Sequence, residues 1–169
     1  AMYRAVALFA INNGIDAKNE TEKLVSRLNE VEIDIKYTDE GQQIYLLGEN
    51  VSKRIREEDV SVGASNVAVI PEVRKKLVEL QRKMAESANV IMDGRDICSY
   101  VLPNADVKVY LTASVECRAM RRFKELEGKG EACDFEQIRQ DIQERDERDM
   151  TREIAPLKQA EDATLIDSS

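Results

Sequence analysis

The segment IQERDERDMTRE, residues 142–153, places two arginines and a carboxylate at regular spacing. Arg145, Asp149 and Arg152 are separated by four and three positions, which would bring them onto one face of a helix. Two guanidinium groups on either side of a carboxylate can hold a polyol and a phosphate together. The same pattern is also typical of a solvated helix that carries salt bridges, so both interpretations stay open at this point.

A second group of charged residues follows a short apolar run in the segment VIMDGRD, residues 90–96. The apolar run predicts a central strand of a parallel sheet, and ligands of such sheets bind beyond the carboxyl ends of the strands. Gly94 would let the backbone turn close to a ligand. Arg95 can offer a planar fork to a phosphate, and Asp96 can accept from an exocyclic amine. The alternative is an Arg–Asp ion pair that closes the end of the strand.

Two further groups of candidate binding residues stand elsewhere in the chain. Arg118, Arg121 and Arg122 are spaced to share one helix face before a glycine-containing loop, where they could form a phosphate clamp at the base of a closing lid. The alternative is an exposed basic face on an acidic protein. Near the start of the sequence, Tyr3 could stack on a ligand and Arg4 could bind a phosphate.

The composition limits the chemistry that these groups can support. The 169 residues carry a net charge of −8, which does not favour nucleic-acid binding, although converging arginines can still bind a small anion. The absence of histidine excludes histidine-based acid–base catalysis and histidine metal sites. The three cysteines have no CxxC spacing, which argues against a zinc site or a disulfide framework and fits a reducing compartment. Phosphoryl transfer suits this inventory, because it depends mainly on positioning and charge neutralisation.

The elements that must position these residues alternate between helices and strands. Helices are predicted at 2–12, at 20–29, from Pro71 to the ESAN segment, from Ser114 to Gly128, and from Asp134 to about residue 150. The helix from Pro71 has one apolar stripe, made of Val73, Leu77, Leu80 and Met84. Strands at 31–37 and 43–47 form an antiparallel hairpin across a turn at 38–41, and apolar runs at 90–92, 107–113 and 163–167 indicate further strands. This order predicts an α/β domain with a parallel sheet and a small inserted lobe.

Six segments, read in chain order, resemble those of bacterial cytidylate kinases: AMYRA, IPEVR, DGRD, KVYLTAS, RDERD and REIAPL. The resemblance spans essentially the whole chain. It implies a P-loop nucleoside monophosphate kinase that transfers the γ-phosphoryl group of ATP to CMP or dCMP with Mg2+. The implied fold has a parallel-sheet core at 1–14, 86–122 and 135–169, an inserted α+β monophosphate-binding lobe at 15–85 that contains the hairpin, and a lid at 123–134.

The resemblance also assigns roles to residues that match the family motifs. Tyr3 and Arg4 match positions beside the CMP phosphate. Ser65, Arg74 and Asp96 match positions that read cytosine. An anion and a hydroxyl can accept from the N4 amine of cytosine, and an arginine can donate to N3 and O2. Uracil has a carbonyl at position 4, so Asp96 would repel it.

The remaining matches concern the ribose, the phosphates and the lid. Arg145 and Asp149 match ribose contacts, and Asp93 matches a supporting carboxylate near the site. Arg118 falls on the lid side, toward ATP. The resemblance implies a catalytic role for two phosphate-contacting and two lid arginines, namely Arg95, Arg152, Arg121 and Arg122.

The chain departs from the family pattern in one large respect. No G-x-x-x-x-G-K-S/T motif occurs in it, and Gly128-Lys129 lacks both the upstream glycine and the following hydroxyl residue. That motif would cradle the ATP phosphates and supply a hydroxyl to Mg2+. We therefore expect no phosphoryl transfer from a polypeptide that truly lacks it.

The expected partners are CMP or dCMP and ATP, for a cytoplasmic monomer without nucleic-acid or membrane partners. Two alternatives stay open. The first is a kinase for another nucleoside monophosphate, UMP or AMP, against which the Asp96 carboxylate and the enlarged lobe argue. The second is a non-catalytic CMP-binding or interaction fragment, in which the charged helices serve as partner faces.

Overall fold

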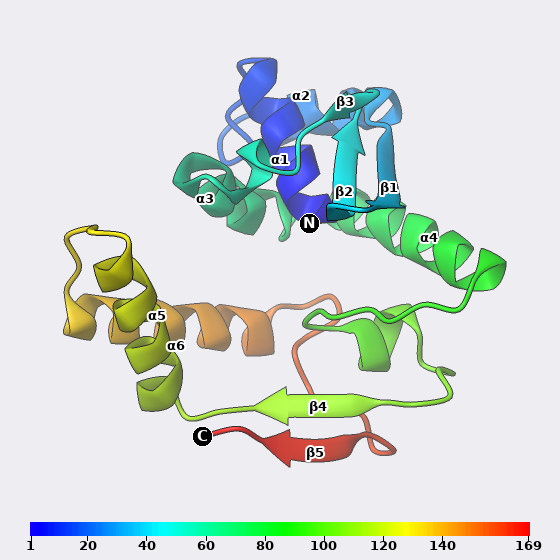
Figure 1. The fold of residues 1–169 in the computed structure, drawn as a ribbon. Coiled ribbons are helices and arrows are strands. Elements are labelled where there is room, and N and C mark those ends of the chain that lie inside the picture. The colour runs from blue at the N-terminus through cyan, green and yellow to red at the C-terminus, as the bar shows by residue number, and fades with distance from the viewer. The chain divides into compact units, whose positions relative to one another are not determined.

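The computed structural model describes residues 1–169, which divide into two compact units, Ala1–Ser87 and Ala88–Ser169. The element order of the first unit begins with α1 (Met2–Asn12), α2 (Thr21–Ser26) and the 3-10 turn η1 (Leu28–Glu30). The strands β1 (Ile33–Thr38), β2 (Gly41–Leu46) and β3 (Glu49–Asn50) follow, and the unit ends with the 3-10 turn η2 (Arg54–Arg56), α3 (Glu58–Val67) and α4 (Pro71–Ser87) (Figure 1).

Helix α1 lies at the centre of the first unit, because its sequence is apolar on nearly every side. Met2 and the run 5–10 are buried, and the helix ends before Gly14, whose φ of 61° suits a glycine. Helix α3 packs on α1. A Cβ on Gly63 would lie 3.2 Å from the Cβ of Ala7, so the glycine permits the close approach of these two helices.

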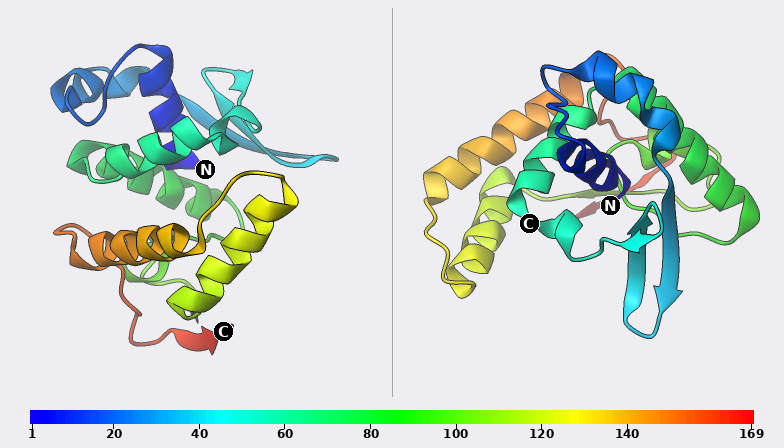
Figure 2. Two further views of the ribbon diagram at one scale, coloured as in Figure 1. Left: turned by 90° about the vertical axis from the view of Figure 1, so that its left-hand side faces the viewer. Right: turned by 90° about the horizontal axis from the view of Figure 1, so that it is seen from above.

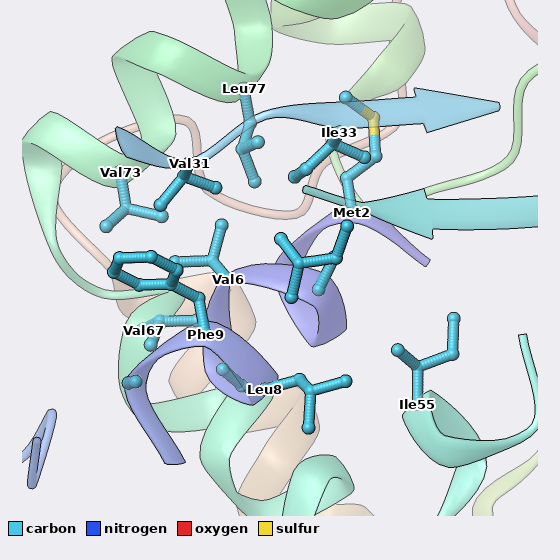
Figure 3. Packing of buried hydrophobic residues seen from close by; sticks show 14 of the residues in the cluster. Met2, Val6, Leu8, Phe9, Val31, Ile33, Ile55, Val67, Val73 and Leu77 are labelled. Atoms are coloured by element: carbon cyan, nitrogen blue, oxygen red, sulfur yellow. The ribbon is translucent and has the colours of Figure 1, made fainter. Parts of the chain in front are cut away.

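The core of the first unit gathers around α1 (Figure 3). Val73 and Leu77 of α4 are fully buried in this cluster, and Leu80 and Met84 pack against it. The apolar stripe predicted for this helix is therefore confirmed. Phe9 is also buried there, and the guanidinium of Arg27 lies 5.3 Å from its ring centroid.

The three strands of the first unit form a small antiparallel sheet that confirms the predicted hairpin. Strands β1 and β2 pair from Ile33 opposite Leu46 to Thr38 opposite Gly41, and β3 extends the sheet beside β2. The connection is shorter than the predicted turn at 38–41, because only residues 39 and 40 lie between the last paired positions. The hairpin extends away from α1 in the view from above (Figure 2).

The second unit contains the parallel strands and the two charged helices. Its elements are the π-helical turn η3 (Ile97–Val101), β4 (Val109–Thr112), α5 (Val115–Gly128), α6 (Phe135–Thr151) and β5 (Thr164–Asp167). Strands β4 and β5 pair in parallel, with Val109 opposite Thr164 and Thr112 opposite Asp167. The predicted α/β fold with a parallel sheet and a separate antiparallel hairpin is therefore confirmed.

Both charged helices begin at the predicted caps. The Ser114 hydroxyl accepts from the amide of Cys117, and the Asp134 carboxylate accepts from the amide of Gln137. Helices α5 and α6 pack side by side, as two views show (Figures 1 and 2). The rings of Phe123 and Phe135 meet edge to face at 6.2 Å near the connection between them.

The prediction of a strand at 90–92 is wrong. Residues 88–96 form neither helix nor strand, and the side chain of Ile91 is fully exposed. A central parallel strand needs a hydrogen-bonded neighbour on each side, and the parallel sheet of this chain consists of β4 and β5 alone. Asp93, Gly94, Arg95 and Asp96 therefore do not end a strand but lead into η3.

The π-helical turn was not predicted. The carbonyl of Asp96 accepts from the amides of Tyr100 at 2.9 Å and Val101 at 3.1 Å, and this pairing opens the turn. Turns of this kind are frequent at functional sites, and this one begins at a predicted site residue.

None of the helices in the two units combines the length and the apolar character that a membrane span requires.

Candidate functional site

Helix α6 presents two carboxylates, Asp146 and Asp149, to the arginine of the DGRD segment. The two acids are three positions apart, so they share one face of the helix. Arg95 lies between them, with its Nη1 3.6 Å from Asp146 Oδ1 and its Nε 3.1 Å from Asp149 Oδ2. The loop residue Arg95 and helix α6 are thus joined through two ion pairs.

Arg152, at the carboxyl end of α6, extends this arrangement back to the DGRD segment. Its Nη1 lies 3.5 Å from Asp149 Oδ1, and its Nη2 lies 3.6 Å from Asp96 Oδ2. Its Nε donates to the carbonyl of Ala155 at 2.7 Å, and Ala155 adopts a positive φ of 51°. Asp96 is buried, so the charge of Arg152 offsets a carboxylate that has been removed from water.

Arg118 of α5 joins the same set of charges. Its Nη2 lies 2.6 Å from Asp146 Oδ2, and its Nε donates to the carbonyl of Ala113 at 3.0 Å. Three arginines therefore alternate with three aspartates in one continuous set within the second unit. We call this set the arginine–aspartate network; its members are Arg95, Arg118, Arg152, Asp96, Asp146 and Asp149.

One carboxylate oxygen of the network is unusual. Asp149 Oδ2 is buried and receives no aligned hydrogen bond, although Arg95 Nε lies 3.1 Å away as an ion-pair partner. A buried acceptor without a donor costs free energy unless a further group supplies that donor. The oxygen therefore has no aligned hydrogen-bond donor within the chain itself.

The three arginines of α5 go to three different partners. Arg118 enters the network, whereas Arg121 donates to the hydroxyl of Ser168 at 3.3 Å and to its carbonyl. Arg122 pairs with Glu125 of its own helix at 3.0 Å. The three side chains therefore point to different partners, although they start from the same helix. A phosphate clamp formed by all three arginines stays a prediction. The ion pairs described above do not involve two other predicted residues, Asp93 and Arg145, both of which are exposed.

The first unit brings together part of the other predicted set. Arg74 is 3% exposed, and its guanidinium carbon lies 6.0 Å from the ring centroid of Tyr3. Arg74 Nη1 also donates to the carbonyl of Ala68 at 3.3 Å. Arg4 Nη1 donates to the carbonyl of Ile55 at 3.1 Å, and Ser65 lies half-buried on α3.

Asp146 is the site residue that the sequence interpretation missed. The signal was present, since Asp146 precedes Asp149 by three positions and therefore lies on the same helix face.

No group of three or more acidic or cysteine side chains in the chain is arranged to hold a metal ion. The acids of the network are interleaved with arginines.

Comparison with known proteins identifies the family. The family model described as cytidylate kinase matches residues 1–169. A cytidylate kinase of Caldicellulosiruptor bescii is 50% identical over 169 residues, which are 100% of this chain and 74% of the relative. The cytidylate kinase of Caldicellulosiruptor saccharolyticus has the same identity and coverage. The cytidylate kinase of Anoxybacillus flavithermus is 45% identical over 100% of this chain and 75% of the relative. The chain therefore belongs to the cytidylate kinase family.

Proposed function

We propose that this protein binds CMP or dCMP as the acceptor in phosphoryl transfer from ATP, giving CDP or dCDP. The family supports the reaction, and the relatives named above carry the name cytidylate kinase. The structural observation that carries the proposal is the arginine–aspartate network, which combines phosphate-binding guanidiniums with a buried acceptor suited to a sugar hydroxyl. An acidic chain without histidine can use such a set, because the reaction needs positioning and charge neutralisation more than proton transfer.

Within the second unit, different members of the network are assigned to different parts of the nucleotide. Arg95 and Arg152 are assigned to the phosphates, since a planar guanidinium can form two parallel hydrogen bonds with phosphate oxygens. Asp149 is assigned to the ribose, because its buried Oδ2 can accept from a hydroxyl while Oδ1 stays near Arg152. Arg145, exposed on the same helix, is assigned to the ribose with it.

Base reading is assigned to Asp96, Arg74 and Ser65. Asp96 is an ionised acceptor suited to the N4 amine of cytosine and unsuited to the O4 carbonyl of uracil. Arg74 can donate to N3 and O2, and its stacking near Tyr3 limits the directions that its fork can take. Discrimination against uracil should be strong, because UMP would leave buried Asp96 facing another acceptor.

The ATP side of the reaction rests on fewer residues of this chain. Arg118, Arg121 and Arg122 are assigned to the charge that develops on the transferred phosphoryl group. Mg2+ neutralises phosphate charge when it accompanies ATP, and no acidic cluster of this chain is arranged to hold the ion. We also propose a cytoplasmic location, which suits three cysteines that are all free thiols.

Titration calorimetry with CMP and UMP tests the proposal on the nucleotide acceptor side. We expect measurable CMP binding and UMP binding that is weaker by at least about a hundredfold, because the buried Asp96 carboxylate would face the O4 acceptor of uracil instead of the N4 donor of cytosine. Equal affinities for CMP and UMP would remove the base-reading roles of Asp96, Arg74 and Ser65. An ADP-release assay with CMP and ATP, run on a polypeptide that includes the phosphate-binding motif, tests phosphoryl transfer separately from binding.

A further inference from the structure

Asp146 is shared by two guanidinium groups that come from separate parts of the second unit. Its Oδ1 lies 3.6 Å from Arg95 of the DGRD segment, and its Oδ2 lies 2.6 Å from Arg118 of α5. The side chain of Asp146 is 14% exposed, whereas those of Arg95 and Arg118 are 38% and 31% exposed. The carboxylate is therefore the inner member of the three, and the arginines reach it from the more exposed side.

Electrostatics make this shared carboxylate necessary for the arrangement. Two guanidiniums on one carboxylate carry like charges at short range, and each would repel the other without the acid between them. Asp146 and Asp149 are likewise negative charges three positions apart on a helix, an unfavourable pair unless arginine lies between them. Arg95 and Arg118 can stay close to each other because the negative charge of Asp146 offsets both positive charges.

The second contact of each arginine shows what Asp146 controls. Arg118 Nε is tied to the carbonyl of Ala113, just beyond β4, so the contact of its Nη2 with Asp146 fixes the direction of the fork. Arg95 Nε is tied to Asp149, so the contact of its Nη1 with Asp146 fixes the second point of that guanidinium plane. One carboxylate thus sets the orientation of both forks.

We propose that Asp146 is a positioning residue, which orients Arg95 toward the phosphate of CMP and links it to Arg118 of the α5–α6 pair. This inference rests on the proposed function and deepens it. Asp146 acts through the arginines and needs no contact with the nucleotide. Without its charge, Arg95 keeps only Asp149 among its ion-pair partners, and its fork turns away from the phosphate toward that residue.

The test compares CMP binding by calorimetry for wild type, Asp146→Asn and the matched control Glu147→Gln. Glu147 is the next residue on α6 and is exposed, so the control removes the same charge from the same helix. We expect Asp146→Asn to weaken CMP binding by about fivefold to tenfold and Glu147→Gln to leave it unchanged. Wild-type affinity in Asp146→Asn would overturn the inference while the proposed function stands.

A double-mutant cycle separates positioning from a merely structural role. If Asp146 acts through Arg95, Asp146→Asn should cost almost no further affinity in an Arg95→Lys background, because the geometry that it maintains is already lost. If it only stabilises the packing of α5 on α6, the two losses should add, and additivity would overturn the inference. The same variants in urea denaturation report the stability change independently of nucleotide.

Two further outcomes keep the test decisive. If Asp146→Asn does not fold, Asp146→Glu carries the test, because it keeps the charge but moves the carboxylate by one methylene. CMP binding weakened in Asp146→Glu at unchanged unfolding free energy supports positioning, and wild-type affinity in that variant overturns it. A wild-type chain that binds neither CMP nor UMP overturns the proposed function and the inference together.

Discussion

Replacing Asp149 with alanine should separate the binding role of the network from its contribution to stability. Asp149 contacts Arg95 at 3.1 Å and Arg152 at 3.5 Å. Both arginines keep another carboxylate in the variant, because Asp146 lies 3.6 Å from Arg95 and Asp96 lies 3.6 Å from Arg152. The free energy of unfolding should therefore fall by only about 1 kcal/mol, because neither arginine is left without a carboxylate partner.

The loss of nucleotide affinity should be larger. Asp149 Oδ2 is the buried acceptor that we assign to a ribose hydroxyl, and a hydrogen bond to a charged group contributes about 1.5–3 kcal/mol. That range corresponds to a loss of about tenfold to a hundredfold in CMP affinity. The 2′,3′-dideoxy analogue of CMP lacks both ribose hydroxyls, so its affinity should change little between wild type and Asp149→Ala.

The assay is titration calorimetry of both nucleotides against wild type, Asp149→Ala and the control Glu147→Ala, which removes an exposed charge from the same helix. Urea denaturation of the same three proteins gives the stability change. Unchanged CMP affinity in Asp149→Ala would refute the ribose assignment. An equal loss for CMP and for the dideoxy analogue would also refute it, because the effect would then pass through the arginines.

Three further predictions concern packing, capping and pH. Leu77→Ala opens a cavity at a fully buried site and should lower the unfolding free energy by about 2–5 kcal/mol in urea; an unchanged midpoint would contradict the assigned core. Ser114→Ala removes the hydroxyl acceptor of the Cys117 amide and should cost about 1 kcal/mol by the same measurement, with Ser114→Thr as the control that keeps a cap. The hydrogen bond from Lys108 lowers the pKa of Asp162, so this carboxyl stabilises the fold above its unfolded pKa and loses that contribution as the pH falls through its folded pKa. Asp162→Asn should therefore flatten the fall in stability below about pH 4, and an identical acid profile would contradict this pairing.

The elements that could be predicted are those specified by local sequence. Pro71 and the stripe that follows it give α4, Ser114 gives the start of α5, and Asp134 gives the start of α6. The hairpin of β1 and β2 follows from alternating residues around a turn. In each of these cases the deciding interactions lie within a few positions of one another, so the pattern in the chain carries them.

The misses arose where the deciding partner is distant in sequence. An apolar run at 90–92 indicates a strand only if neighbouring strands lie beside it, and the chain pairs β4 with β5 instead. Helical spacing placed Arg118, Arg121 and Arg122 on one face. It could not specify that Arg118 reaches α6 while Arg121 reaches the residue after β5. A helical pattern shows which face a long side chain leaves from, but it does not specify the distant residue that the side chain contacts.

The alternation of charges in the network affects how tightly it can bind a phosphate. Arg95, Arg118 and Arg152 each face at least one aspartate of the same chain, so a phosphate must share or replace an existing anion. The carboxylates keep like-charged guanidiniums assembled, which reduces the cost of ordering them for a ligand, but they also compete with that ligand. Affinity built on phosphate contacts alone would therefore be modest. The buried Oδ2 of Asp149 and the base-reading residues supply contacts that free phosphate cannot make, so we expect CMP to bind far more tightly than inorganic phosphate.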